Sequence, residues 1–490
     1  MQKTYAQPAW GVGTNRQRGM ETLFVKQFVD PGLGNSSYLI ASKETGAAVV
    51  IDPQRDVDKY LQTAEGLGLR LTHSLETHLH ADFVSGSLEL AHLLEQINLF
   101  QIGASARAEL QYPHRPLSEG ERLALGQLSI RVIETPGHTP EHVSYAVYDE
   151  GADAPGALFT GGSLIVGGAG RSDLLGEEYA VSLAEAQFHS LHDKLLKLPD
   201  EVVVYPTHGA GSFCITPAGK ERVTTIGQER RTNPLVQIDT KQEFVKRALM
   251  GLSTYPTYYR HMRRLNREAR SVLDGVPALT ALDPYEFQKR SQQGAVIIDV
   301  RPAREFIARH IPNSYGIPLA TPLASWAGWV VPFGSPIILV ADLFDEVEEA
   351  TRQLIRIGYD DLRGYLAGGL EYWEKADLPI FSWHQVSASR LRQWLRRDSD
   401  SPFLLDVRQN NEWLQGHIEG ARHVEAGILS QVANTLVPRD RPVVVHCARG
   451  NRSTVALSIL EQKGFQNLFA LEDGIASWSQ AGYEIVQGEQ

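Results

Sequence analysis

Two histidines separated by a single residue are the first candidates for chemistry in this chain. His78 and His80 lie in the run Thr-His-Leu-His-Ala-Asp-Phe at 77–83, between an apolar, strand-like approach and a helix-like stretch at 87–94. Imidazoles with this spacing on a strand-to-helix turn can both reach one metal ion, and the Asp82 carboxylate can support them. A surface loop can also hold two histidines by chance, so the interpretation depends on residues further along the chain.

Two further histidines occur in similar settings. His138 lies in Thr-Pro-Gly-His-Thr-Pro at 135–140, and His208 lies in Tyr-Pro-Thr-His-Gly at 205–209. Each comes after a short apolar run, which predicts a position at the end of a strand. One histidine alone is more often structural, but three such motifs in this order favour a metal centre.

A cysteine in the last quarter of the chain offers a second kind of chemistry. Cys447 follows an apolar run and precedes a predicted helix that begins near Arg452. Backbone N–H groups at a helix N-terminus stabilise a thiolate and lower the pKa of the thiol. Arg449 and Arg452 add positive charge that attracts an anionic sulfur donor. We predict these three residues as catalytic, and the rest of the loop as substrate-binding: Ala448, Gly450, Asn451 and Ser453.

This cysteine belongs to the second copy of an internal repeat with a period of about 106 residues. Residues 296–301 recur at 403–408, and residues 336–341 recur at 442–447. Strands that alternate with helices in units of this size predict a parallel sheet with covering helices. In the first copy Ala341 occupies the cysteine position, and acidic residues come after it: Asp342, Asp345, Glu346, Glu348 and Glu349. We therefore predict that the first copy carries no sulfur and is a scaffold or docking domain.

The part of the chain before the repeat resembles the metallo-β-lactamase superfamily. From 21 to about 270, short apolar strands alternate with amphipathic helices, and the motifs at 77–82 and 135–140 are similar to those of the persulfide dioxygenases. The match extends to the segments 52–53, 170–173 and 205–206. The resemblance implies an αββα sandwich with its metals at one sheet edge. The two repeats resemble rhodanese domains, and the loop at 447–452 has the length of a sulfurtransferase loop.

Two positions depart from the pattern of these relatives. Phe83 stands where the first motif usually has a histidine, and Gly162 stands where the family has an aspartate. By the same resemblance, a second ion would keep only Asp82 and His208 of its ligands, which is too few to hold it. We therefore predict at most one metal ion, bound by His78, His80 and His138. Asp173 could in principle replace the lost carboxylate, but its motif looks structural in the family.

The expected fold class is α/β and multidomain, with an αββα metallo-β-lactamase sandwich and two rhodanese-like parallel α/β domains. The predicted boundaries are a disordered leader at 1–20, a metallo-β-lactamase-like domain at 21–272, an inactive rhodanese-like domain at 273–381 and an active one at 382–490. The leader lacks the hydrophobic region of a secretory signal, and Met20 is a candidate start of the protein.

The composition argues against several kinds of partner. The chain has 490 residues, of which 42% are hydrophobic and 21% are charged, as is typical of a globular protein. A net charge of −11 argues against nucleic acid and anionic membranes as partners. Cys214 and Cys447 are too few for a disulfide framework, which favours a reducing cytoplasm. We also expect a homo-oligomer.

The resemblance implies a function in sulfane-sulfur metabolism. The expected N-terminal reaction is oxidation of a persulfide on a low-molecular-weight thiol such as glutathione, with one non-haem Fe(II) per chain or, alternatively, Zn²⁺. The expected C-terminal reaction is sulfur transfer through Cys447, with thiosulfate or sulfite as partner. Two alternatives stay open: a zinc-dependent thioester hydrolase of the hydroxyacylglutathione type fused to a sulfurtransferase, and a non-catalytic platform that serves the rhodanese domain.

The other cysteine, Cys214, lies six residues after His208 in a glycine-rich segment. Such a loop can bring its next side chains over the metal pocket. We therefore hypothesise that Cys214 is catalytic and receives or presents sulfane sulfur there. A small buried core cysteine is the alternative.

Overall fold

The structure, a computed structural model, describes residues 20–95, 100–215, 221–250, 252–397 and 401–488. The predicted leader lies outside these residues, except for Met20. The described chain falls into two compact units. The first comprises the residues up to 277 other than 256–258, together with 355–358, and the second comprises the remainder. Among the described residues, no helix combines the length and the apolar character that a membrane span requires.

The first unit is built on two six-stranded sheets. The strands of the first sheet lie in chain order: β1 (Leu23–Asp30), β2 (Asn35–Ser42), β3 (Ala47–Ile51), β4 (Arg70–Leu75), β5 (Gln101–Ser105) and β6 (Arg115–Leu117). The second sheet also keeps chain order: β7 (Arg122–Leu125), β8 (Leu128–Glu134), β9 (Val143–Tyr148), β10 (Ala157–Gly161), β11 (Val203–Pro206) and β12 (Thr224–Thr225). The antiparallel pairs β1–β2, β2–β3 and β7–β8 are joined by short turns, whereas the parallel pairs β3–β4, β4–β5 and β10–β11 are joined by crossovers that contain α1, α2 and α3.

The two sheets stack because side chains alternate between the faces of each strand. In β2, Tyr38 lies in the core between the sheets, where its ring meets Phe159 of β10 edge-on with centroids 5.2 Å apart. The next residue, Leu39, lies in a second cluster with Tyr60 and Leu90, under the helices outside the first sheet. Both faces of β2 are buried.

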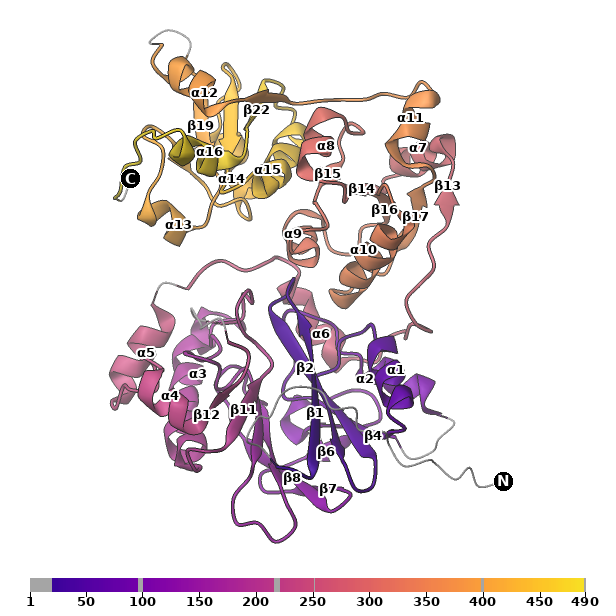
Figure 1. The fold of residues 1–490 in the computed structure, drawn as a ribbon, viewed down its shortest axis with the longest axis vertical. Helices are drawn as coiled ribbons and strands as arrows, with labels where there is room; N and C mark the ends of the chain where they lie inside the picture. Colours follow the sequence, from indigo (N-terminus) through magenta and orange to yellow (C-terminus); the bar gives the residue numbers. More distant parts are fainter. Residues whose placement is uncertain (1–19, 96–99, 216–220, 251, 398–400, 489–490) are drawn as a thin grey trace. The chain divides into compact units, whose positions relative to one another are not determined.

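Helices cover the outer faces of both sheets. Helices α1 (Asp58–Gly66) and α2 (Ser87–Leu93) pack on the first sheet. Figure 1 shows the helices of the second sheet gathered beside β11 and β12: α3 (Glu177–His189), α4 (Ile226–Thr232) and α5 (Lys241–Leu249). A further helix, α6 (Tyr259–Arg267), completes the unit. The result is the αββα sandwich that the sequence predicts.

The second unit contains two five-stranded sheets whose pairings are all parallel. The first sheet has the order β13 (Ala281–Leu282), β17 (Leu362–Leu366), β16 (Ile337–Val340), β14 (Val296–Asp299) and β15 (Tyr315–Gly316). The second has the order β18 (His384–Val386), β22 (Leu468–Leu471), β21 (Val443–His446), β19 (Phe403–Asp406) and β20 (Arg422–His423). The two orders are equivalent, as the sequence repeat predicts.

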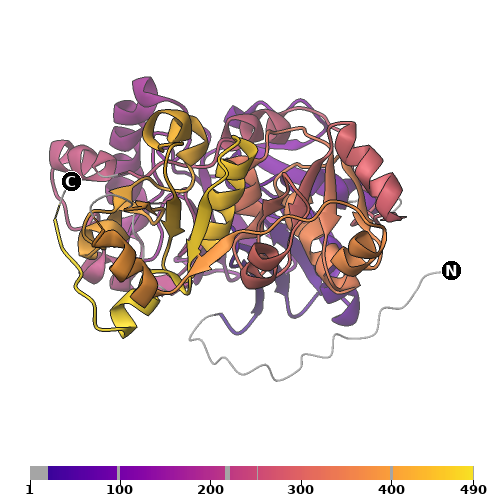
Figure 2. The same ribbon diagram turned by 90° about the horizontal axis from the view of Figure 1, so that it is seen from above.

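Each copy carries the same set of helices beside its sheet. In the first copy they are α7 (Pro284–Gln292), α8 (Ala303–Ala308), α9 (Leu323–Val330), α10 (Phe344–Arg356) and α11 (Gly369–Lys375). In the second they are α12 (Ala388–Leu395), α13 (Asn410–Gln415), α14 (Leu429–Leu436), α15 (Asn451–Gln462) and α16 (Gly474–Gln480). Figure 2 shows the orange and yellow strands of the second copy with helices beside them. The α/β multidomain fold class is confirmed.

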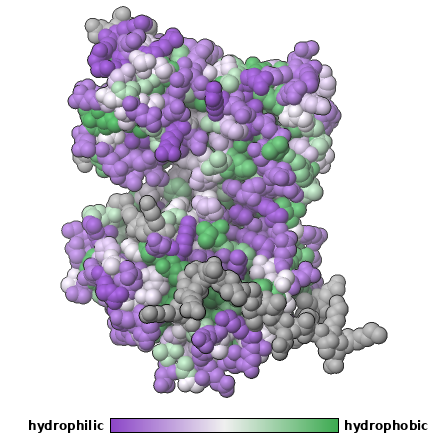
Figure 3. All heavy atoms as spheres, viewed as in Figure 1, coloured by the Kyte–Doolittle hydropathy of each residue, from purple (hydrophilic) through white to green (hydrophobic). Residues whose placement is uncertain are grey.

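The surface is largely hydrophilic, as expected when the apolar faces of the sheets are covered. Purple residues dominate the face seen in Figure 3. Large hydrophobic side chains that are exposed lie singly or in small groups, among them Leu343 and Phe344, at the start of α10 in the first copy.

Candidate metal centre and cysteine loop

The four candidate histidines meet at one edge of the sandwich, because each follows the carboxyl end of a strand. His78 and His80 follow β4, His138 follows β8, and His208 follows β11. None of the four is more than 3% exposed. The strand ends therefore bring together imidazoles that are far apart in the sequence.

Three of these imidazoles converge: His78, His138 and His208. Each offers a ring nitrogen that lies within 4.8 Å of the other two, and the Nε2 atoms of His78 and His208 are 3.2 Å apart. The Nε2 atom of His138 is buried and has no hydrogen-bond partner among the described residues. Burial lowers the pKa of His138 to about 3, so this imidazole is neutral and keeps a lone pair for a metal ion.

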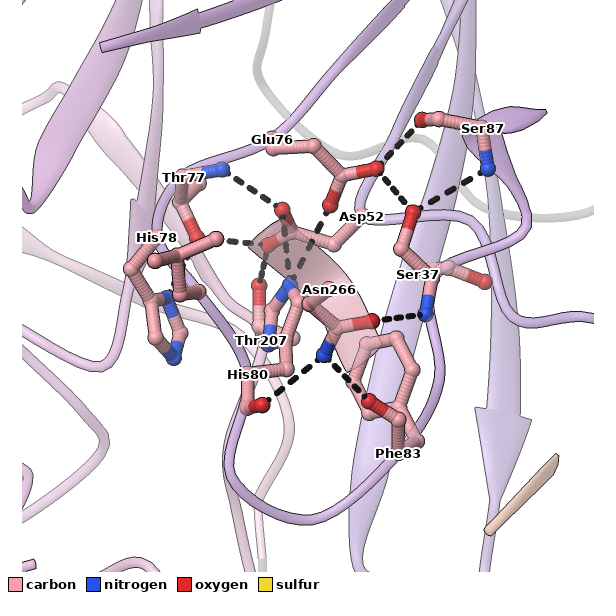
Figure 4. A network of polar contacts seen from close by, with 12 residues as sticks. Ser37, Asp52, Glu76, Thr77, His78, His80, Phe83, Ser87, Thr207 and Asn266 are labelled. Carbon is pink, nitrogen blue, oxygen red and sulfur yellow. Dashed lines mark hydrogen bonds and ion pairs between the residues drawn. The ribbon is translucent and has the colours of Figure 1, made fainter. Parts of the chain in front are cut away.

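His80 is turned toward two carboxylates. Its Nε2 atom lies 3.2 Å from Asp52 Oδ1 and 3.5 Å from Glu76 Oε2, as Figure 4 shows. Burial alone would lower the pKa of His80, but these carboxylates outweigh it and raise the pKa to about 10. His80 also lies within reach of Asp82 and His208. The set expected from the sequence, His78 with His80 and His138, thus differs from the set that converges, and it stays a prediction.

The two positions that depart from the family pattern both pack against imidazoles. Phe83 is fully buried and stacks on His80 with ring centroids 4.1 Å apart. A Cβ atom built at Gly162 would lie 2.4 Å from Cδ2 of His138, closer than real Cβ contacts allow. The imidazole of His138 therefore fills the space that the side chain of an aspartate would need.

Sequence reasoning missed His142 and Asn266. The ring of His142 stacks on His78 with centroids 4.9 Å apart, and its Nε2 atom accepts a hydrogen bond from the Gly162 N–H at 3.0 Å. Its position four residues after His138 could have indicated that it lies at the same site. The side chain of Asn266, in α6, donates to the carbonyls of His80 and Phe83 at 2.9 Å each (Figure 4). It lies 186 residues from His80 in the chain, so no local pattern points to it.

Asp173 supports the site indirectly. Its carboxylate accepts two hydrogen bonds of 2.6 Å from the guanidinium of Arg171. The carbonyl oxygen of Arg171 lies 2.7 Å from Nδ1 of His138 and accepts a hydrogen bond from it. Asp173 thus holds Arg171, the residue whose carbonyl contacts His138.

Cys214 is fully buried. Its Sγ atom lies 3.7 Å from the Tyr259 hydroxyl. Burial first, and then the nearby Asp82 carboxylate, raise the pKa of Cys214 well above its ordinary value. The side chain is therefore a thiol and a weak nucleophile. These contacts favour the core alternative, and a role in sulfur transfer stays a prediction.

The cysteine loop connects β21 to α15. Sγ of Cys447 accepts a hydrogen bond from the Gly450 N–H at 3.1 Å. Gly450 has φ = 103°, a conformation that favours glycine, so this turn depends on the missing side chain. Arg452 is paired with Glu412, with one N–O distance of 2.7 Å. Arg449 is exposed and therefore accessible to an incoming anion.

The predicted substrate-binding residues of the loop differ in accessibility. Ala448 and Gly450 are half-buried, and Asn451 is exposed at the first position of α15. The Ser453 hydroxyl is buried and has no hydrogen-bond partner in the part of the chain that the structure describes.

The equivalent turn of the first copy is closed by a carboxylate. Ala341 follows β16, and five residues later Glu346 stands where the second copy has Arg452. Oε2 of Glu346 accepts hydrogen bonds from the backbone N–H groups of Asp342 and Leu343, at 3.1 Å each. A negative charge thus occupies the donors that an anionic substrate would use.

Comparison with known proteins identifies both parts. A family model described as a rhodanese-like domain matches residues 283–376 and 387–481. The persulfide dioxygenase ETHE1 of Homo sapiens is 30% identical over 236 residues, which cover 48% of this chain and 83% of that protein. The chain belongs to the persulfide dioxygenase family. Two rhodanese-like domains come after the part that matches this family.

Other relatives extend the comparison. A hydroxyacylglutathione hydrolase of Rhodospirillum rubrum is 31% identical over 233 residues, which cover 42% of this chain and 84% of that protein. A crystal structure of a metallo-β-lactamase from Staphylococcus aureus shares 30% identity with a TM-score of 0.62, and the match covers 70% of this chain and 99% of that one. That match is longer than one domain, so it extends into the rhodanese-like part of this persulfide dioxygenase family member.

Proposed function

We propose that this protein oxidises a low-molecular-weight persulfide at the histidine cluster and transfers sulfane sulfur through Cys447. In the first reaction, R–S–SH, O₂ and H₂O give R–SH, HSO₃⁻ and H⁺. The outer sulfur loses four electrons to dioxygen, and the S–S bond breaks with return of a proton to the thiol. Similarity to persulfide dioxygenases and the presence of rhodanese-like domains in one chain support this pairing.

The observation that carries the metal-dependent half is the convergence of three buried imidazoles. Their ring nitrogens lie within 4.8 Å of one another, and imidazole nitrogen is a ligand for both zinc and iron. Ferrous iron, when bound, supplies the redox chemistry for dioxygen. The chain itself holds the imidazoles in place, excludes bulk water by burial, and offers a pocket beside His78 whose lining includes Glu76, Tyr112 and Glu141.

In the second reaction the Cys447 thiolate attacks the outer sulfur of a donor. With thiosulfate, Cys–S⁻ and S–SO₃²⁻ give Cys–S–S⁻ and SO₃²⁻, so one S–S bond forms as another breaks. The Gly450 N–H, which now contacts Sγ, is placed to stabilise negative charge on the sulfur. The reverse direction consumes the sulfite that the first reaction makes.

Oxygen uptake tests the proposal. Metal-free protein is loaded anaerobically with Fe²⁺, its iron content is measured, and glutathione persulfide is added. We expect uptake of one O₂ and release of one sulfite per persulfide. Cys447→Ser should leave this uptake unchanged and abolish transfer from thiosulfate. An iron-loaded protein that consumes no oxygen would contradict the first half of the proposal.

A zinc-dependent thioester hydrolase is the second candidate. The converging donors are all nitrogens, without the carboxylate expected in the family's iron site, and hydroxyacylglutathione hydrolases are among the relatives. A zinc ion at this site would lower the pKa of a bound water. Hydrolysis of S-lactoylglutathione by the zinc-loaded protein, together with no oxygen uptake by the iron-loaded protein, would favour this function.

A further inference from the structure

The hydrogen bonds around the converging imidazoles fix where their protons lie. Nδ1 of His138 contacts the carbonyl oxygen of Arg171, which can only accept, so Nδ1 carries the proton. Nδ1 of His208 lies 3.0 Å from Oδ1 of Asn35. The amide of Asn35 donates through Nδ2 to Asp82, so its oxygen faces His208 and accepts. In both histidines, Nδ1 is therefore the nitrogen held by a protein oxygen, and Nε2 is the nitrogen left to bind an ion.

The position of the proton on His78 is set by a longer chain of contacts. The Thr77 hydroxyl donates its hydrogen to Asp52 at 2.8 Å, so its oxygen is left to accept. Nδ1 of His78 lies 2.8 Å from that oxygen and donates to it. Nε2 of His78 is therefore also left to bind an ion. Histidine ligands of metal ions generally have this arrangement, with the second ring N–H held by an oxygen of the protein.

Two of these Nε2 atoms lie close together. The Nε2 atoms of His78 and His208 are 3.2 Å apart, and the Nδ1 atom of each ring already contacts a protein oxygen. Two imidazole nitrogens at this separation need a cation between them, either a proton or a metal ion. Nitrogens bound at about 2.0–2.1 Å to one tetrahedral ion lie roughly 3.3 Å apart, which matches the observed separation.

We propose that His208, and not His80, is the third ligand of the metal, so that His78, His138 and His208 bind the ion through Nε2. This inference rests on the proposed metal-dependent function and names the site of that function. His80 is held elsewhere: its Nε2 atom contacts Asp52 and Glu76, and Phe83 stacks on its ring. The ligand set has thus changed along with the loss of the family's aspartate.

The packing at Gly162 shows why the aspartate cannot simply be restored. A Cβ atom there would meet Cδ2, Cγ and Nε2 of His138 at 2.4, 2.9 and 3.0 Å. The Gly162 N–H is in turn held by His142. A side chain at 162 would therefore displace the ring of His138, which is itself a ligand in this proposal.

Metal binding to single variants tests the ligand set without an activity assay. Metal-free wild type, His208→Ala and His80→Gln are titrated with Co²⁺, the affinity is measured by competition with a chelator, and the visible spectrum of the bound ion is recorded. We expect His208→Ala to lose more affinity than the roughly 10–100-fold that loss of a supporting residue costs. We expect His80→Gln to bind one ion with the wild-type spectrum, because glutamine can still donate to Asp52.

Two results would overturn the proposal. One is wild-type affinity in His208→Ala. The other is a changed Co²⁺ spectrum, or loss of the ion, in a His80→Gln protein whose circular dichroism is that of wild type. If His208→Ala does not fold, the His80→Gln spectrum alone decides, because an unchanged spectrum supports the proposal and a changed one overturns it.

Position 162 gives an independent test with a matched control. Gly162→Ala adds only the Cβ atom, whereas Gly162→Asp adds the Cβ atom and the lost carboxylate. We expect both to bind Co²⁺ and Fe²⁺ more weakly than wild type, with Asp no better than Ala. Tighter Fe²⁺ binding by Gly162→Asp than by wild type would overturn the inference. These titrations measure metal binding and not turnover, so they can support the proposed ligand set even if the protein takes up no oxygen.

Discussion

Nε2 of His310, in the first rhodanese-like copy, lies 3.0 Å from a carboxylate oxygen of Glu461, in α15 of the second copy. The same carboxylate accepts the indole N–H of Trp383 at 2.7 Å and the backbone N–H of Asn313 at 2.8 Å. The side chain of Glu461 is only 9% exposed. Because α15 begins at the Cys447 loop, the first copy contacts the helix that follows the cysteine of the second copy.

Replacing Glu461 by Ala should destabilise the second unit. The change leaves the indole N–H of Trp383 and the backbone N–H of Asn313 without their acceptor, and the His310 ring without its contact, which lowers the free energy of unfolding by about 2–3 kcal/mol. Glu461→Gln keeps an acceptor oxygen and should lose less. Thermal and denaturant unfolding of the full chain measure the difference. Equal stability of the Ala variant and wild type would show that the contact contributes nothing.

Restoring a cysteine in the first copy should not restore transfer. In Ala341→Cys, tested with Cys447→Ser, the Glu346 carboxylate still caps the turn, and the acidic residues repel anionic donors and disfavour a thiolate. We expect thiosulfate transfer about 100-fold or more below wild type. Adding Glu346→Arg should raise it. Near wild-type transfer by Ala341→Cys with Glu346 in place would contradict this account.

The two arginines of the active loop should have separable effects. Arg449 is exposed and is predicted to attract the donor, so Arg449→Ala should raise KM for thiosulfate and make it less sensitive to salt, with a smaller change in kcat. Arg452 is paired with Glu412, so Arg452→Ala should lower kcat and stability by leaving that carboxylate unpaired beside the loop. Steady-state kinetics at two ionic strengths separate the two patterns. Matching profiles for both variants would refute the assignment.

The buried carboxylate of Glu89 should make the first unit sensitive to acid. Glu89 contacts Arg55 at 2.9 Å and Arg270 at 2.6 and 2.7 Å. Burial raises its pKa, but the two guanidinium groups outweigh burial and lower it below the ordinary value. A carboxyl with a lowered folded-state pKa stabilises the fold above its unfolded pKa of about 4.3. That contribution is lost as the pH falls through the folded-state value.

Glu89→Gln removes the charge at every pH. We expect it to lower the free energy of unfolding at neutral pH by roughly 3–5 kcal/mol, because it leaves two buried guanidinium groups without their anion. The difference from wild type should shrink as the pH falls below about 4. Denaturant unfolding measured between neutral pH and about 3 reports both effects. A difference that does not change with pH would argue against a lowered pKa.

Patterns that are local in the chain were sufficient to predict the cysteine loop, the repeated domains and the positions of the histidines at strand ends. Residues 447–452 contain the thiol, the glycine turn and the arginines together, so the sulfur-transfer loop could be predicted directly. The repeat predicted two equivalent sheets, and Ala341 predicts that the first copy transfers no sulfur. The histidines were placed at strand ends because the apolar runs before them are contiguous with them. Backbone geometry over a few residues determines each of these features.

The proposed ligand set, in contrast, rests on tertiary structure. Asp52 and Glu76 hold the ring of His80, whereas Asn35 orients the ring of His208. These contacts determine which of the two rings can join His78 at a metal ion. These partners come from different strands and turns, and Asn35 is 173 residues from His208 in the chain. A sequence motif names residue types and spacing, but the direction of a buried ring is set by the hydrogen bonds that burial forces it to satisfy. Those bonds exist only once the sheets have brought their strand ends together.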